Sequence, residues 1–212
     1  MQNRRTTTRA AAQKKRKPPP RRVQPPTREQ VYRVADAMPT PMLRSYVLCM
    51  AWSGLRFFEV GMLEWRDVVP REGGTARLHV REGKGYAGVS KERWSVLLEP
   101  GVEALMDCVP PGRLTGLVFH TAAYRPVTKQ YFRYYWKKAR EEVELPWLWT
   151  HDLRKFCATH LLNSGATDLD VAVQLGHVDR QGRPNPELVR AVYGYPDLDR
   201  ALDRVAEIGS AG

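Results

Sequence analysis

Two short segments, residues 76–81 and 93–98, alternate apolar and polar side chains as the strands of an antiparallel hairpin do. Elsewhere the apolar residues recur at the three- and four-residue spacing of helices. Helices are therefore expected at 28–38, 41–53, 60–65, 102–108, 128–143, 151–164, 168–175, 186–192 and 198–208, with one further brief strand at 117–119. This pattern predicts a mainly α-helical (α+β) fold that carries one small antiparallel β-sheet.

The first 27 residues have a composition unlike the rest of the chain. They hold nine Lys or Arg and five Pro, but no acidic residue and no Leu, Ile, Phe, Tyr or Trp. Such a segment buries too little apolar surface to offset its ordering entropy, so we expect a disordered basic arm at 1–27 and a folded domain at 28–212. The net charge is +11, but residues 28–212 hold 25 basic and 23 acidic residues, a balance of only +2. The arm is either a solvated linker or a segment that contacts nucleic-acid phosphates.

Membrane insertion and secretion are not indicated by the sequence. The longest unbroken apolar stretch, Tyr46–Trp52, is far shorter than the roughly 20 residues of a spanning helix. The basic N-terminus runs into prolines instead of an apolar signal segment. The three cysteines, at 49, 108 and 157, have the spacing of neither a disulfide framework nor a zinc site. We expect a reduced, soluble, cytoplasmic protein that makes no membrane contact.

Cationic residues lie at two predicted helix starts. Arg56 follows Gly54, and Glu59 comes one turn later; the pair fits either an anion site, with Glu59 orienting the arginine, or an ordinary surface ion pair. His151 and Arg154 share one face of the next such helix. An imidazole beside a fixed guanidinium suits a phosphate on which charge develops, although a solvated first turn has the same residues.

Three further residues belong to turns or to the end of the chain. Lys84 stands between glycines in the predicted hairpin loop, His177 follows the predicted C-cap Gly176, and Tyr193 directly follows the helix expected at 186–192. Each alone has an ordinary structural interpretation. The sequence has no phosphate-binding P-loop and no His, Cys or carboxylate cluster at ligand spacing, so we expect neither a metal nor a cofactor.

Taken in order, these motifs resemble the catalytic domain of the tyrosine recombinases, the phage integrase family. The resemblance covers about residues 27–208. It rests on SGLRFFE (53–59), GKG (83–85), THDLRKFCATHLLNSGA (150–166), LGH (175–177) and a tyrosine near the C-terminus. The His-Asp-Leu-Arg block with its continuation and the later Leu-Gly-His are the most specific of these motifs.

The resemblance implies a role for each matching residue. Arg56 and Arg154 would clamp the scissile phosphate, with Glu59 in support. His151 would bind a non-bridging oxygen or assist proton transfer, and His177 would orient the phosphate or the nucleophile. Lys84 would protonate the 5′-hydroxyl leaving group. Tyr193 would attack phosphorus and form a 3′-phosphotyrosyl bond, without metal or ATP.

This sequence departs from the family pattern in three places. Tyr193 follows His177 by 16 positions where the family usually has about nine, so Tyr195 is an alternative nucleophile. Lys91 is an alternative to Lys84 as the general acid. The helical core-binding domain that usually precedes the catalytic domain is not recognisable in residues 1–27.

The resemblance implies a site-specific DNA recombinase or integrase of a mobile element. Its partners would be double-stranded DNA and further copies of itself, as a tetramer on DNA, and its location the nucleoid. Two alternatives stay open: an accessory DNA-binding relative without catalysis, and DNA relaxation of the type IB topoisomerase kind. The predicted helix at 198–208 would either dock on a neighbouring protomer or fold back on its own core.

Overall fold

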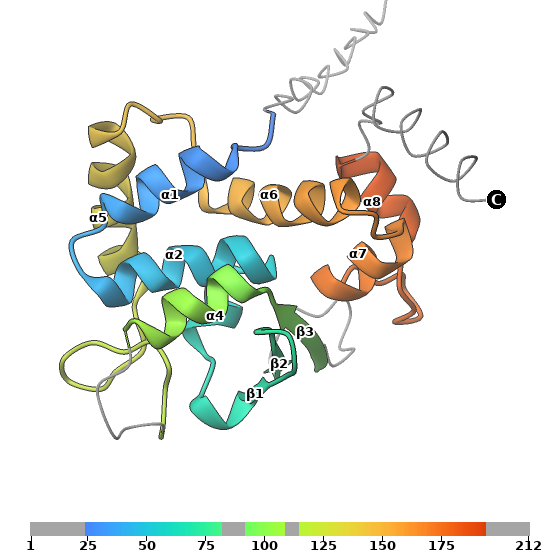
Figure 1. Ribbon diagram of the computed structural model, residues 1–212, viewed down its shortest axis with the longest axis horizontal. Helices are drawn as coiled ribbons and strands as arrows, with labels where there is room; N and C mark the ends of the chain where they lie inside the picture. The colour runs from blue at the N-terminus through green and yellow to red at the C-terminus, as the bar shows by residue number, and fades with distance from the viewer. Residues whose placement is uncertain (1–23, 82–91, 109–114, 194–212) are drawn as a thin grey trace, which may run out of the picture.

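The computed structural model describes residues 24–81, 92–108 and 115–193 (Figure 1). Within them the chain forms helices and one sheet. The elements in chain order are α1 (Arg28–Asp36), α2 (Pro41–Ser53), α3 (Phe57–Gly61), the 3-10 turn η1 (Trp65–Asp67), β1 (Val68–Pro70), β2 (Ala76–Val80), β3 (Arg93–Leu97), α4 (Glu99–Met106), α5 (Lys129–Glu142), α6 (Thr150–Asn163), α7 (Asp168–Leu175) and α8 (Pro186–Tyr193). The expected mainly helical fold with a small antiparallel sheet is confirmed.

The helix ends follow from their capping residues. Thr27 accepts a hydrogen bond from the Gln30 amide and donates its own amide to the Gln30 side chain, which forms a capping box for α1. Thr40 caps α2 through the Leu43 amide. Gly54 ends α2 with a φ of 67°, a backbone conformation that favours glycine. These boundaries agree with the sequence prediction.

Helix α2 is the centre of the larger hydrophobic core. Nearly every side chain along α2 is buried, because α1, α4 and α6 pack around it. The Tyr46 ring meets Phe57, Phe119 and Phe132 at centroid distances of 4.8–5.3 Å. We call the whole cluster of buried apolar residues around α2 the main core; it extends from Val31 in α1 to Phe156 in α6.

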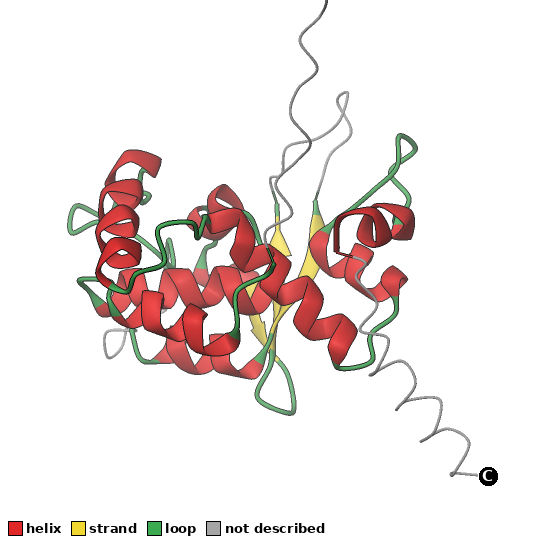
Figure 2. Cartoon of the chain, turned by 90° about the horizontal axis from the view of Figure 1, so that it is seen from above, coloured by secondary structure: helices red, strands yellow, loops and turns green. Residues whose placement is uncertain are grey.

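The sheet has three antiparallel strands in the order β1-β2-β3. Strands β2 and β3 confirm the predicted hairpin, with pairs from Ala76–Leu97 to Val80–Arg93. Strand β1 was not predicted; three residues ending in Pro70 are too short to show an alternating pattern. The strands stand between the main group of helices and the pair α7–α8 (Figure 2).

Two predictions between residues 60 and 119 are wrong, and they have one cause. The expected helix over 60–65 ends at Gly61 and resumes as η1, while the expected strand at 117–119 is a single bridge between Glu64 and Leu117. The backbone at 63–65 bonds to 116–118 on both sides of that bridge. Because residues 63–65 pair with 116–118, they do not continue the helix. The pairing is also too short to form a strand at 117–119.

A second, smaller group of buried apolar side chains joins α7 and α8 to the end of α6. We call it the C-terminal cluster; it consists of Ala158, Val171, Ala172, Leu175, Val189 and Tyr193. Helix α6 runs from the main core to this cluster (Figure 1). The predicted basic arm, apart from its last residues, and the predicted helix 198–208 lie outside the described residues. No helix among the described residues is long and apolar enough to cross a membrane.

Candidate phosphate-binding site

The turn between α2 and α3 presents Arg56. At Gly54 a Cβ atom would come within 2.4 Å of the Leu175 side chain and 3.1 Å of Cys157 Sγ, so this turn packs closely on α6 and α7. Arg56 is the N-cap residue of α3. Its amide donates to Glu59 Oε2 at 2.8 Å, and its Nη1 donates to Oε1 at 2.9 Å. The Arg56 side chain keeps 35% of its surface exposed, which leaves donors free for a ligand.

Glu59 is buried between two arginines. Besides Arg56, it accepts two hydrogen bonds of 3.1 Å from Arg93 at the start of β3. Burial alone would raise the pKa of Glu59, but Arg93 and Arg56 hold that pKa below its usual value. Glu59 is therefore an anion that orients Arg56.

Helix α6 carries His151 and Arg154 in its first turns. Trp149 is the N-cap residue of α6, and Asp152 accepts its amide at 2.8 Å. His151 is exposed, whereas Arg154 is only 2% exposed. The pKa of His151 is lowered by partial desolvation and by Arg154, so its imidazole is neutral at pH 7.

Two backbone carbonyls hold the buried guanidinium of Arg154. Its Nη1 donates to Gly54 O at 2.6 Å, at the end of α2, and its Nη2 donates to Leu175 O, at the end of α7. The negative ends of two helix dipoles thus converge on one cation. Burial and the nearby Arg56 lower the pKa of Arg154 to about 10, so it stays charged at neutral pH.

His177 lies in the turn after α7, as predicted. Gly176 ends the helix with a φ of 64°, and His177 is 7% exposed. Its ring stacks on Tyr193, with centroids 5.7 Å apart and planes 9° apart. Burial, then Arg154 and Arg56, lower the pKa of His177 to about 3, so the imidazole is neutral. Its Nδ1 has no hydrogen-bond partner among the described residues.

The chain between His177 and Tyr193 folds into a tight turn and a helix. Val178 and Pro184 form a bridge that closes off residues 178–184, and the Asn185 amide donates to His177 O at 2.7 Å. Helix α8 then begins at Pro186 and ends at Tyr193, which is 6% exposed. The phenol is close enough to Arg154 to affect the pKa of that arginine.

Three expected residues cannot be placed. Lys84, Lys91 and Tyr195 lie outside the described residues. The structure thus brings together Arg56, Glu59, His151, Arg154, His177 and Tyr193, in an arrangement centred on Arg154. Among the described residues, no group of His, Cys, Asp or Glu is placed to hold a metal ion.

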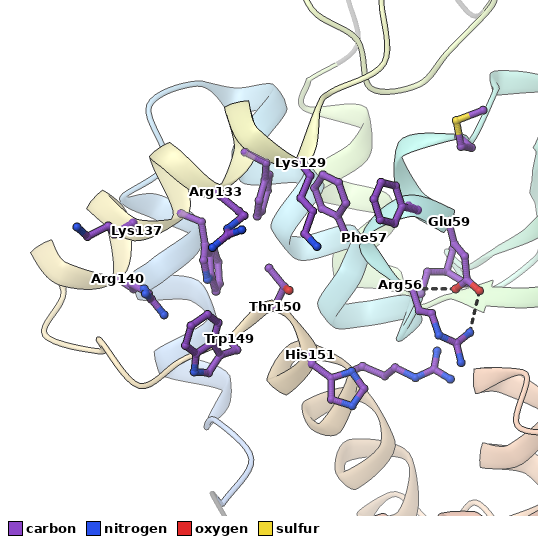
Figure 3. Close-up of a pocket in the computed structure, with 16 residues that line it drawn as sticks. Arg56, Phe57, Glu59, Lys129, Arg133, Lys137, Arg140, Trp149, Thr150 and His151 are labelled. Atoms are coloured by element: carbon purple, nitrogen blue, oxygen red, sulfur yellow. Dashed lines mark hydrogen bonds and ion pairs between the residues drawn. The ribbon is translucent and has the colours of Figure 1, made fainter. Parts of the chain in front are cut away.

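A cavity of about 930 Å³ opens beside this site. Arg56, Glu59, His151 and Arg154 line one end of it, while His177 and Tyr193 are not part of its lining. Four cations of α5 line it too, with Lys129 between the two ends and Arg133, Lys137 and Arg140 toward the other end, where the exposed Trp149 lies (Figure 3). Because these cations are spaced by four, four and three residues, they lie on one face of α5. That spacing is visible in the sequence, but we did not predict it as a site.

The whole groove suits a polyanion. Its cations stand in a row on α5 and continue to Arg56 and Arg154, while the described part of its lining contains one acidic residue, the already paired Glu59. Fixed guanidinium groups can each hold two phosphate oxygens. A nucleic-acid backbone laid along the groove would therefore meet cations throughout, with His151 and Arg154 at one end.

Comparisons with known proteins agree with this geometry. The family model described as "Phage integrase family" matches residues 26–182, which include His177 but not Tyr193. The chain is 28% identical over 149 residues to the integrase of Mycobacterium phage FRAT1, covering 63% of this chain and 44% of that protein. It is 29% identical over 149 residues to the integrase of Mycobacterium phage D29, covering 63% and 40%. The match thus spans less than half the length of each relative.

Solved structures show the same fold at low sequence identity. The XerA recombinase superposes with a TM-score of 0.63 at 17% identity, covering 90% of this chain and 65% of that one. XerH recombinase bound to its difH substrate gives 0.58 at 20% identity, covering 83% and 51%. A lambda integrase dimer bound to a COC′ core site gives 0.53 at 19% identity, covering 77% and 47%. The expected resemblance to tyrosine recombinase catalytic domains is confirmed.

Proposed function

The chain belongs to the phage integrase family, and on that premise we propose that it cleaves and rejoins DNA strands in site-specific recombination. One observation carries the proposal: Arg56, His151, Arg154, His177 and Tyr193 come from four separate segments and gather around the Arg154 guanidinium. Packing of the fold does not by itself require five such side chains in one place. The attack of a tyrosine on a phosphodiester does require such a group of side chains.

The cations supply what the reaction needs. As a phenol oxygen attacks phosphorus, negative charge builds on the non-bridging oxygens. Arg56 and Arg154 would take that charge, each preorganised by partners within the protein. His177, neutral because of its lowered pKa, would donate a hydrogen bond without adding a charge. These groups do the work that a metal ion does elsewhere, so we propose cleavage without metal or ATP.

Tyr193 Oη would form a bond to phosphorus while the bond from phosphorus to the 5′ oxygen breaks. His151, neutral at pH 7, is placed either to assist removal of the phenol proton or to bind a non-bridging oxygen. Lys84, or else Lys91, would protonate the 5′ oxygen. The phosphotyrosyl bond keeps the phosphodiester energy, so an incoming 5′-hydroxyl can reverse the step.

The turn at 178–184 supports Tyr193 over Tyr195 as the nucleophile. The bridge between Val178 and Pro184 closes off those seven residues as a side loop. Without them, Tyr193 would follow His177 by nine positions rather than 16, the spacing that the family usually has. The longer connection therefore still delivers Tyr193 to the face of the His177 ring.

We propose that residues 28–212 form the catalytic domain and that 1–27 act as a basic arm on DNA phosphates. The row of cations on α5 would hold the DNA backbone next to the cleavage site. Recombination joins strands from two duplexes, so we also propose that copies of the chain associate on DNA. The chain would act on double-stranded DNA in the nucleoid.

Supercoiled plasmid tests this proposal without knowledge of the target site. We expect the unaltered protein to nick the plasmid and to stay covalently attached after SDS, in EDTA and without ATP. Tyr193→Phe should abolish the attached species and keep DNA binding, whereas Tyr195→Phe should leave it. Loss of attachment in Tyr195→Phe alone would move the nucleophile. Binding without nicking by the unaltered protein would favour an accessory DNA-binding protein, and relaxation without four-way junctions a topoisomerase-like enzyme.

A further inference from the structure

Arg93 is a partly buried arginine outside the set of site residues that the family pattern indicates. It is the first residue of β3, and its side chain is 14% exposed. On the proposed function, we propose that Arg93 is a positioning residue, which sets the phosphate-binding Arg56 through Glu59 and supports the turn that carries His177.

The contacts of Glu59 show how Arg93 reaches Arg56. Arg93 Nη1 and Nη2 donate to Glu59 Oε1 and Oε2, both at 3.1 Å, in the two-pronged geometry specific to arginine. The same two oxygens accept Arg56 Nη1 and the Arg56 amide at 2.9 and 2.8 Å. Each carboxylate oxygen is thus shared by the two arginines. Because Glu59 is 4% exposed, water has little room to replace either partner.

Arg93 also packs against the turn before His177. A Cβ atom at Gly176 would lie 2.3 Å from Arg93 Nε and 2.6 Å from its Cδ, closer than real side chains allow. The absence of a side chain at Gly176 therefore makes room for the Arg93 stem. One arginine thus touches both the α3 start, where Arg56 sits, and the α7 end, where His177 sits.

The electrostatics are consistent with this arrangement. Burial raises the pKa of Glu59, and Arg93 is the strongest of the influences that lower it, ahead of Arg56. Arg93 also lowers the pKa of His177. If Arg93 were absent, the pKa of Glu59 would therefore rise. Protonated Glu59 could no longer accept both Arg56 donors, so Arg56 would lose its fixed orientation as the pH falls.

The test measures the rate of covalent attachment to supercoiled plasmid and, separately, DNA affinity. We expect Arg93→Lys to slow attachment about 10–100-fold, the range seen when a supporting side chain is lost, with DNA affinity nearly unchanged. Arg77→Lys on the neighbouring strand β2 is the control, because Arg77 is exposed and its guanidinium lies 4.9 Å from the Trp94 ring centroid. It should attach at the unaltered rate. Thermal unfolding of each variant shows whether it folds.

Two readouts separate positioning from a merely structural role. As the pH is lowered, the attachment rate of Arg93→Lys should begin to fall at a higher pH than that of the unaltered protein, because Glu59 then takes up a proton more readily. The double variant Arg93→Lys/Glu59→Gln should attach almost as fast as Glu59→Gln alone, because Arg93 acts on Arg56 through Glu59 and each single change already interrupts that contact. An unchanged rate and pH profile in a folded Arg93→Lys would overturn this inference alone. No attachment by the unaltered protein would overturn the proposed function and this inference with it.

Discussion

The main core and the C-terminal cluster hold the two halves of the candidate site, and they are built differently. The main core surrounds α2 with helices on several sides and fixes Arg56 and Glu59. The C-terminal cluster joins α7 and α8 through six buried side chains, one of them from α6, and carries His177 and Tyr193. The proposed phosphate-binding residue Arg56 therefore rests on the main core, and the proposed nucleophile Tyr193 on the C-terminal cluster.

Among the described residues, few polar contacts connect the main core to the C-terminal cluster, and Arg154 makes two of them. Its guanidinium bonds to Gly54 O of the main core and to Leu175 O of the C-terminal cluster. Gln174 makes a second connection, from α7 to Ser53 O and to both backbone groups of Val96. The nucleophile's place relative to the phosphate site thus depends on a small number of buried hydrogen bonds. A small cluster held in this way is suited to move as a unit.

The largest effect is expected from breaking the Arg154 connection. Arg154→Lys keeps a positive charge but cannot present two nitrogens to Gly54 O and Leu175 O together with a phosphate. We expect covalent attachment to plasmid to slow on the order of 10²–10³-fold. Arg66→Lys, a change at a surface arginine, should leave the rate unaltered. If Arg154→Lys attached at the original rate, Arg154 would have no part in the reaction.

Gln174→Ala tests the second connection. It removes the partner of the Val96 amide and carbonyl and one of the two donors to Ser53 O, at a cost of about 1–3 kcal/mol per group left unsatisfied. Hydrogen exchange followed by mass spectrometry should show faster exchange in 168–193, with α2 and α5 nearly unchanged. Equal acceleration in α2 and α7 would mean that the main core and the C-terminal cluster unfold as one.

A smaller effect is expected on DNA binding by the main core. Lys137→Ala removes one cation from the groove, so the slope of log affinity against log salt should become shallower by about 1. Lys138→Ala is a close control, because Lys138 is absent from the groove lining and its Nζ lies 4.6 Å from the Tyr134 ring centroid. If both variants shift the slope equally, the groove is not the DNA path.

The smallest effect concerns pH and the C-terminal cluster. The pKa of His177 is about 3 in the folded chain against 6.5 for a free histidine, so the unfolded chain binds more protons between these values. The contribution of His177 to stability is complete above about pH 6.5 and declines as the pH falls toward 3. Between pH 7 and pH 5, the Tm of His177→Gln should therefore fall less than the Tm of the unaltered protein. An equal loss in both would show that His177 takes up no excess protons on unfolding.

Local signals in the sequence were enough to predict most of this fold. Thr27, Thr40, Gly54 and Gly176 mark helix ends that the structure confirms, because capping acts within a few residues. Strand β1 is too short to show an alternating pattern, and the bridge between Glu64 and Leu117 joins segments that are far apart in sequence, so no local pattern indicated either pairing. The motif order likewise indicated the six site residues that the structure gathers around Arg154.

What the sequence did not reveal are the buried partners. Arg93 looks like an ordinary polar residue at a strand start, and Gln174 like a helix surface residue. Their importance comes from Glu59 and Val96, which only the tertiary fold brings within reach. Burial of Arg154 was equally hidden, since His151, on the same predicted helix face, is exposed.

The most direct test is to identify the residue to which DNA becomes covalently attached. Supercoiled plasmid would be incubated with the unaltered chain, the reaction stopped with SDS, and the DNA digested to nucleotides. Mass spectrometry of the peptides should then show a nucleotide on Tyr193, the phenol that the structure stacks on His177. A nucleotide on another residue, or DNA binding with no adduct at all, would contradict the account.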